Sequence, residues 1–245
     1  MSVEVLKSKA QIERAREELR SRGLSCVRGG SIFRRVARRL GLYRTLNVGD
    51  EVKNWDVLKT VQFIEKTIAK DSAVLDIGAY ASEILCVLHR LGYSNLTGVD
   101  LNPKIQRMPY ADSVRYVVSD FMHTPFDDAS FEAVTSISVI EHGFDGKALL
   151  SEMGRLLRPG GYFMASFDYW PEKIDTTGVP FFGMDWKIFS RREVLEFVEE
   201  ARKYGFSPCG KIDLVAEERP LECKGRQYTF AWLALRKGTG LSGMP

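Results

Sequence analysis

Residues 73–91 constrain the fold of this chain more than any other stretch. Ala73–Ile77 is an apolar run of strand length, and after Gly78 the chain soon enters Glu83–Leu91, which has helical spacing. A buried strand, a tight turn and a helix open nucleotide-binding α/β domains. Gly78 permits a backbone conformation that a Cβ disfavours, and the helix start offers unpaired N–H groups to a polar ligand. Many α/β proteins contain such a turn without a ligand, so the turn alone leaves the question of binding open.

A second short strand, Asn95–Asp100, makes a ligand site more specific. Asp100 lies at its tip, 22 residues after Gly78. An acidic residue in this position binds the ribose hydroxyls in nucleotide-binding folds, because its two oxygens accept two hydrogen bonds. NAD and S-adenosylmethionine sites share both features. The pattern therefore predicts a nucleotide-like cofactor without choosing between them.

Three further strands are predicted at Ser113–Val118, Phe131–Val139 and Tyr162–Phe167. Their apolar, β-branched character is typical of a buried parallel sheet. In such a sheet the carboxyl ends of the strands form the ligand crevice. A Gly or polar residue follows each of the five strands, and we expect these residues to share one rim: Gly78, Asp100, Asp120, His142 and Asp168.

The segment Leu156–Phe163 contains a helix end, a Pro-Gly-Gly turn and the start of a strand. Together with Asp76–Glu83, Val99-Asp100, Ser119–Phe121 and Val139–His142, it resembles the class I S-adenosylmethionine-dependent methyltransferases over roughly residues 55–236. The resemblance implies an α/β, Rossmann-like, seven-stranded and mostly parallel sheet with flanking helices, and S-adenosylmethionine as cofactor. One departure concerns the usual Gly-x-Gly-x-Gly turn, which keeps only Gly78. The Ser82-Glu83 form resembles methyltransferases of glycan and natural-product gene clusters.

The same resemblance implies a set of cofactor-binding residues. Asp120 matches the position that accepts from the adenine amino group, while the backbone N–H of Phe121 reaches the ring. Asp120 as a turn residue or helix cap is the alternative. In this family the segment before the first strand often borders the cofactor, which makes Lys53 and Trp55 further candidates, although a place in the core is favoured for Trp55. The full expected set is Asp76, Gly78, Ala79, Tyr80, Ser82, Asp100, Leu101, Asp120, Phe121 and Glu141.

A hydroxyl methyl acceptor needs a proton acceptor, and the neutral imidazole of His is suited to that task near pH 7. His142 is the first candidate, Asp168 the second and His123 the third. The alternative is that His142 only shapes the pocket or caps the next helix. Cysteine and histidine spacings resemble no metal site, so no metal is expected.

The stretch Asp168–Phe189 carries six aromatic residues with Pro, Gly and Asp between them. It is longer than a typical connection, which favours a lid or a substrate wall. Aromatic rings and carboxylates suit a sugar or another hydroxylated ring, so we expect O-methylation of a sugar or other small hydroxylated metabolite. N-methylation, a lipid-linked acceptor and a non-catalytic binding protein are alternative functions. For the aromatic stretch itself, the alternative is that its rings close the edge of the core and bind no acceptor. A Rossmann-type oxidoreductase is disfavoured because Tyr80 and Ser82 interrupt the glycine pattern.

The chain divides by charge into a basic front and a slightly acidic remainder. Residues 1–50 hold 12 Lys/Arg against 5 Asp/Glu, and the rest hold 23 against 27. We expect a helical extension over 1–50, with helices Val3–Arg22 and Ser31–Leu40, a methyltransferase domain over 51–237 and a flexible tail over 238–245. The arginines of residues 31–44 fit the solvated basic face of a packed auxiliary helix, and the alternative is that this face meets an acidic substrate or an anionic membrane surface. Nucleic acid is disfavoured because no aromatic residues interleave with them.

The bulk composition is that of a soluble globular protein. Apolar residues make up 44% of the 245 residues and charged residues 27%. We expect neither a membrane span nor a secretory leader, because no run is long enough to span a bilayer and Met1–Ala10 lacks the apolar region of a leader. The four widely spaced cysteines are consistent with a reducing cytoplasm. We further expect a capped helix beginning after Ser190, and an antiparallel pair formed by Lys211–Ala216 and Gln227–Leu235.

Overall fold

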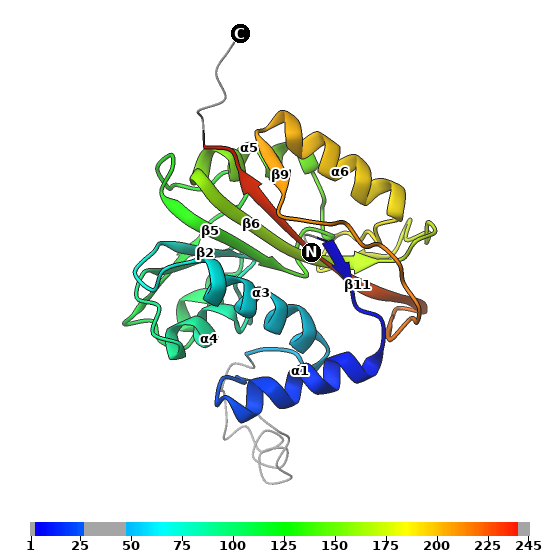
Figure 1. Ribbon diagram of the computed structural model, residues 1–245, viewed down its shortest axis with the longest axis horizontal. Helices are drawn as coiled ribbons and strands as arrows, with labels where there is room; N and C mark the ends of the chain where they lie inside the picture. The colour runs from blue at the N-terminus through cyan, green and yellow to red at the C-terminus, as the bar shows by residue number, and fades with distance from the viewer. Residues whose placement is uncertain (1–2, 27–47, 240–245) are drawn as a thin grey trace.

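The computed structural model describes residues 3–26 and 48–239 (Figure 1). The helix expected at Ser31–Leu40 lies outside the described residues, and so does the proposed membrane-facing segment 31–44. Residues 240–245 of the expected tail are also outside them.

A single twisted sheet runs through the middle of the molecule (Figure 1). Its continuous path is β4 (Val114–Val118), β3 (Leu96–Asp100), β2 (Val74–Ile77), β5 (Phe131–Ile137), β6 (Leu157–Tyr169), β11 (Arg226–Lys237) and β1 (Val3–Val5). The first five strands are parallel, and β11 runs antiparallel to β6. β9 (Phe206–Pro208) and β10 (Leu221–Cys223) also pair with β11. The Rossmann-like, mostly parallel sheet predicted from the sequence is confirmed.

Helices cover both faces of this sheet (Figure 1). On one face lie α1 (Lys9–Ser21), α3 (Asn54–Thr67) and α4 (Ile84–Arg90), whose apolar residues join one core cluster. On the other face lie α5 (Gly146–Leu156) and α6 (Arg191–Lys203), which share a second cluster. Two short 3-10 helices, η1 (Glu51–Lys53) and η2 (Pro103–Arg107), complete this part of the fold. The expected capping box, Ser190 with Glu193, begins α6.

The amino-terminal prediction was partly wrong. Val3–Arg22 was expected to be one helix, but Val3–Val5 form strand β1 and the helix begins at Lys9. Val3 and Val5 alternate with Glu4, and both valines are buried against β11. The alternating period of a strand therefore prevails over helix propensity here.

The expected pairing of Lys211–Ala216 with β11 was also wrong. The free edge of β11 is shared by β10 at one end, β1 in the middle and β9 at the other end. Residues 211–216 contribute one isolated bridge, between Ile212 and Val3. The reason is competition for the edge of β11. Strand β1, from the other end of the chain, pairs with the β11 backbone that residues 211–216 would have used.

Candidate cofactor and acceptor site

The turn after β2 requires a glycine at its first position. Gly78 has φ +67°, and a Cβ on it would lie 2.4 Å from Cγ2 of Val139, in the segment after β5. The absence of a side chain therefore brings the ends of β2 and β5 together. Ala79 is buried, while Tyr80 and Ser82 are half-buried and continue the turn toward α4.

Asp100, at the end of β3, holds this turn in place. Its Oδ2 accepts a hydrogen bond of 3.0 Å from the backbone N–H of Tyr80, and its Oδ1 accepts one of 2.7 Å from Asn102. A carboxylate oxygen has two lone pairs, so both oxygens keep the capacity to accept from a ribose hydroxyl. The next residue, Leu101, is 59% exposed and offers an apolar surface beside the carboxylate.

Two acidic residues of the same turn are buried and only partly hydrogen-bonded. Oδ1 of Asp76 accepts from Oγ1 of Thr135 at 2.7 Å, whereas Oδ2 has no partner in the described structure. Glu83 accepts from the backbone N–H of Cys26 at 3.0 Å through Oε2, and its Oε1 has no partner. Burial raises the pKa of both carboxyl groups to about 7. A ligand that brings donors or positive charge would satisfy these oxygens.

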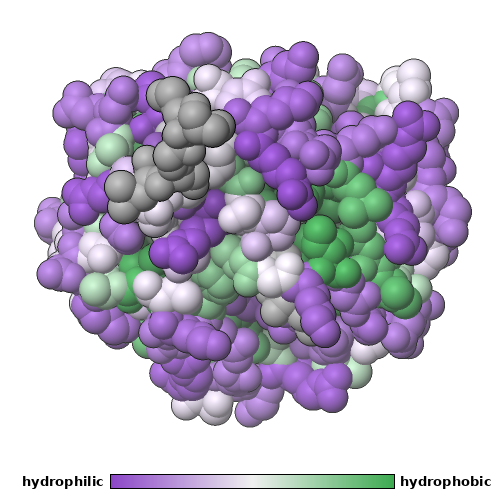
Figure 2. All heavy atoms as spheres, turned by 45° about the horizontal axis from the view of Figure 1, so that its top comes forward, coloured by the Kyte–Doolittle hydropathy of each residue, from purple (hydrophilic) through white to green (hydrophobic). Residues whose placement is uncertain are grey.

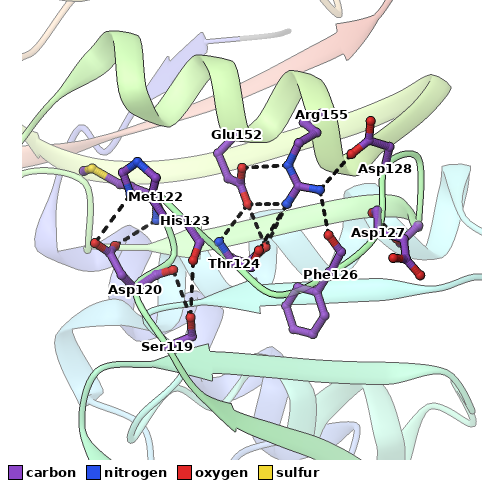
Figure 3. A network of polar contacts seen from close by, with 11 residues as sticks. Ser119, Asp120, Met122, His123, Thr124, Phe126, Asp127, Asp128, Glu152 and Arg155 are labelled. Atoms are coloured by element: carbon purple, nitrogen blue, oxygen red, sulfur yellow. Dashed lines mark hydrogen bonds and ion pairs between the residues drawn. The ribbon is translucent and has the colours of Figure 1, made fainter.

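Asp120 and Phe121 follow β4 on the surface segment shown in Figure 3. Asp120 accepts from the backbone N–H of Met122 at 2.9 Å, which is the turn role that the sequence left open. Nδ1 of His123 lies 3.9 Å from Asp120, and the His123 side chain is 82% exposed. His123, the third base candidate, therefore lacks the burial that distinguishes His142 and Asp168.

A network centred on Arg155 of α5 anchors this surface segment (Figure 3). Its guanidinium donates to both oxygens of Glu152, to Oδ1 of Asp128 and to the carbonyls of Thr124 and Phe126. Glu152 in turn accepts from the backbone N–H and the hydroxyl of Thr124. The loop that carries Asp120 is thus attached to α5 by bidentate, charge-assisted hydrogen bonds.

His142 lies just beyond β5 and beneath a small hairpin, β7 (Pro180–Phe181) and β8 (Met184–Asp185). Its ring centroid is 5.0 Å from that of Phe181 and 5.3 Å from that of Phe182. Burial, together with the nearby Lys53 ammonium, lowers the pKa of His142 to about 4. The imidazole is therefore neutral at pH 7, and its Nδ1 has no partner among the described residues.

Asp168, near the end of β6, lies against the base of the same hairpin. Its Oδ2 accepts a hydrogen bond of 2.7 Å from Nε1 of Trp186. Burial raises the pKa of Asp168 to about 7, while the Trp186 hydrogen bond opposes that rise. Glu141 is 1% exposed, and burial followed by the charge of Asp168 raises its pKa as well. Its Oε2 has no partner in the described structure.

The structure adds residues that sequence reasoning missed. Asp56 is fully buried in the first turn of α3 and accepts a hydrogen bond of 2.7 Å from Oγ of Ser166 on β6. Ser166 also accepts from the backbone N–H of Ser138, which has the strained φ of +50°. The sequence did contain a signal for this residue: Asp56 stands between Trp55 and Val57, on the apolar side of a predicted helix, where a charged residue is unusual.

Lys53, the last residue of η1, supplies positive charge to the surroundings of these buried acids. Burial raises the pKa of Asp56 to about 7, and the Lys53 ammonium opposes that rise. The same ammonium opposes the raised pKa values of Asp76 and Asp168. Trp55 is 4% exposed and belongs to the core, as the alternative in the sequence analysis proposed.

The site fits S-adenosylmethionine. Unpartnered buried atoms gather at the carboxyl ends of β2 and β5 and at the starts of α3 and α4, where the turn of Gly78 excludes a side chain. The side chains involved are Asn54, Asp76, Glu83, Ser136, Ser138, Glu141 and His142. Buried polar atoms are normally hydrogen-bonded, so this set indicates a polar ligand. A sulfonium compound with ammonium and hydroxyl groups supplies the donors and the positive charge that these acids lack.

Comparison with known proteins finds similarity to methyltransferases. Residues 75–165 match a methyltransferase domain family. Over 110 residues the chain is 30% identical to a sterol 24-C-methyltransferase of Pneumocystis carinii, covering 42% of this chain and 29% of the relative. Over 90 residues it is 37% identical to a phthiotriol/phenolphthiotriol dimycocerosates methyltransferase of Mycobacterium tuberculosis, covering 35% and 32%. The chain thus spans about a third of the length of these curated relatives.

Solved structures share the fold. A geranyl diphosphate C-methyltransferase of Streptomyces coelicolor, in complex with Mg²⁺, geranyl diphosphate and S-adenosylhomocysteine, aligns with TM-score 0.55 at 18% identity, covering 80% of this chain and 89% of that one. The cyclase SpnF aligns with TM-score 0.59 at 18% identity, covering 81% and 87%. At these identities the likeness shows the fold and not the reaction.

The sequence motifs, the sheet order and the domain match together show a class I S-adenosylmethionine-dependent methyltransferase domain in this chain. Within that class the matched segment is the methyltransferase domain of residues 75–165, which runs from β2 into β6. The narrower glycan or natural-product variety remains a prediction. In the described ranges, no helix is long and apolar enough to cross a membrane.

Proposed function

We propose that this protein transfers the methyl group of S-adenosylmethionine to a hydroxyl oxygen of a small acceptor bound under the β7–β8 hairpin. The observation that carries the proposal is the convergence of the Gly78 turn, Asp100 and the buried pair His142 and Asp168 at one edge of the sheet. When bound, the cofactor supplies the electrophilic methyl group. The chain's own residues would orient the acceptor, exclude water and accept a proton.

The turn and the strand ends would hold the cofactor. Asp100 would accept from its ribose hydroxyls, and Asp120 from its adenine amino group. The unpartnered oxygens of Asp76 and Glu141 would accept from its ammonium group. The contacts with Asp76 and Glu141 would give two buried carboxyl groups the positive or donor group that they lack.

Asp168 is the better proton acceptor of the two buried candidates. Its pKa of about 7 lies near the working pH, whereas the pKa of His142 is lowered to about 4. General-base catalysis is most effective when the pKa of the base lies near the operating pH. His142, neutral and held against Phe181, would position the acceptor.

A sugar or another hydroxylated ring fits an acceptor site with aromatic walls and carboxylates. Phe181 and Phe182 offer aromatic rings, and Asp168 offers an oxygen. The names of the relatives favour a second candidate, which is methylation of a sterol, lipid or isoprenoid-type acceptor at carbon. Phe182, which is 78% exposed on the hairpin, favours that apolar class.

Calorimetric titration with S-adenosylmethionine and S-adenosylhomocysteine tests the first half of the proposal. We expect micromolar binding by the wild type and at least a tenfold loss in Asp100→Asn, with Asp112→Asn as a control outside the proposed site. A well-folded wild type that binds neither compound would overturn the proposed cofactor.

Transfer of a labelled methyl group to panels of sugars, phenols, sterols and prenyl diphosphates then tests the acceptor. We expect product with a hydroxylated ring, and loss of at least 100-fold in Asp168→Asn with unchanged cofactor affinity. Transfer to carbon of an apolar acceptor alone would contradict O-methylation. Cofactor binding without transfer to any panel would favour the non-catalytic alternative.

A further inference from the structure

One face of α4 carries a cysteine between two charged residues. Glu83, Cys86 and Arg90 follow one another at intervals of three and four residues, so their side chains lie along the same side of the helix. Cys86 is 1% exposed, and Glu83 is the residue at which the cofactor turn passes into the helix. None of the proposed catalytic steps uses Cys86.

The segment after α1 lies across this face. Nη1 of Arg90 lies 3.1 Å from the carbonyls of both Leu24 and Ser25, and donates to them. At the other end, the backbone N–H of Cys26 donates to Oε2 of Glu83 at 3.0 Å. The segment is therefore attached to α4 on both sides of Cys86, which places Cys26 above it.

The two thiols are neighbours, because the segment that carries Cys26 is bound to Glu83 and Arg90, on either side of Cys86. Cys26 packs against the apolar cluster that contains Cys86, and its thiol donates to the carbonyl of Leu24 at 3.7 Å. The neighbouring Cys26 thiol lowers the pKa of Cys86, and the Arg90 guanidinium acts in the same direction against the effect of burial. The pKa of Cys26 is raised. Within the pair, Cys86 is therefore the thiol that more readily forms the nucleophilic thiolate.

We propose that Cys26 and Cys86 are a redox-modification site that closes to an intramolecular disulfide when the protein meets hydrogen peroxide. The Cys86 thiolate attacks the peroxide and becomes a sulfenic acid, and one hydroxide leaves and is protonated to water. The Cys26 sulfur then attacks the sulfenic sulfur, its proton leaves with the departing hydroxyl as a second water, and the S–S bond forms. Two electrons pass from the two sulfurs to the peroxide.

The disulfide would link two segments that are 60 residues apart in the chain. Because it closes a long loop, it restricts the unfolded chain and favours the folded one. It would also make permanent the attachment of residues 24–26 to α4, next to the turn that begins with Gly78. The modification is thus expected to stabilise the amino-terminal segment against the rest of the domain.

Mass spectrometry of the whole chain tests the proposal directly. Purified protein is treated with a small excess of hydrogen peroxide, free thiols are alkylated, and tryptic peptides are analysed without reduction. We expect a loss of two mass units and one cross-linked pair, joining the peptide of residues 23–28 to the peptide of residues 71–90. Dithiothreitol should release the pair.

Matched variants separate this site from general thiol oxidation. Cys26→Ser should abolish the cross-link, whereas Cys209→Ser, at another half-buried cysteine, should leave it unchanged. Peroxide should raise the melting temperature of the wild type by several degrees, and that shift should be absent in Cys26→Ser. Two results would overturn the proposal. In the first, Cys26 and Cys86 can still be alkylated after Cys209 has been oxidised, and in the second they form cross-links only between molecules. No readout depends on methyl transfer.

Discussion

Nε1 of Trp186 donates a hydrogen bond of 2.7 Å to Oδ2 of Asp168, although the two residues are 18 positions apart. This bond attaches the β7–β8 hairpin to the end of β6. Two backbone hydrogen bonds, from Gly143 to Asp185 and from Lys187 to Glu141, attach the same hairpin to the end of β5. One aromatic hairpin thereby closes over both residues that we consider for proton transfer.

Replacing Trp186 with Phe should therefore affect Asp168 more than the fold. The aromatic bulk stays, but the loss of the donor raises the pKa of Asp168 further above 7, because the hydrogen bond opposes its rise. We expect the methyl-transfer rate to fall at pH 7 and to recover as the pH is raised toward 9. Trp170→Phe is the matched control, since the Trp170 Nε1 has no hydrogen-bond partner in the described structure. Equal pH–rate profiles for both variants would contradict this role of Trp186.

Gly78→Ala should unfold the turn that begins the cofactor site. The added Cβ meets both Val139 methyl groups within 2.6 Å and also occupies a φ of +67°. We expect a loss of about 3 kcal/mol or more in the free energy of unfolding. Gly178→Ala separates the two causes, because Gly178 has φ +71° with nothing within 4 Å, and it should lose only about 1 kcal/mol. Similar losses in both variants, measured in urea, would remove the steric argument.

Arg155→Met should loosen the loop that carries Asp120. The substitution keeps much of the apolar stem and removes the guanidinium that holds Glu152, Asp128 and two carbonyls (Figure 3). We expect a loss of about 2–4 kcal/mol in stability and a weaker affinity for S-adenosylhomocysteine. Arg192→Met is the control, because its ion pair with Glu196 is exposed and contributes little. Unchanged affinity in a destabilised Arg155→Met protein would show that the network supports the fold alone.

Asp56→Asn should reveal the cost of a buried carboxylate. The folded-state pKa of Asp56 is raised to about 7 by burial, so the folded protein binds more protons than the unfolded chain between about pH 4 and 7. The free energy of unfolding of the wild type therefore falls as the pH rises through that window, because the buried Asp56 must ionise. Asn can still accept from Ser166, and it removes the titration. We expect the variant to match the wild type near pH 4.5 and to exceed it by roughly 2–4 kcal/mol at pH 8. A stability difference that does not vary with pH would contradict the assignment.

The outer surface of the molecule is mixed in character. On the face in Figure 2 hydrophilic residues predominate, with an area of hydrophobic residues on one side. The basic residues 31–44, which suggested a membrane or acidic partner, lie outside the described residues. The role of that segment remains a prediction.

Local patterns in the sequence predicted the nucleotide-like half of the site. Gly78 and Asp100 are identified by their position after short apolar strands, and the parallel sheet brings them together. The helix that begins after Ser190 is likewise set by a contiguous capping signal. These features depend on residues that are close in the chain, so periodicity and turn chemistry suffice to locate them.

The chain by itself thus determined the order of the parallel strands, the glycine turn and the methyltransferase domain to which they belong. Tertiary structure alone decided which distant residues complete the site. Ser166 meets Asp56 across 110 positions, and β1 takes the edge of β11 that residues 211–216 were expected to fill. Burial also reverses the order in which we propose the two candidate proton acceptors, because it lowers the pKa of His142 and raises that of Asp168. The physical reason is that desolvation and competition for a strand edge depend on the whole packed molecule, and no local window of sequence contains them.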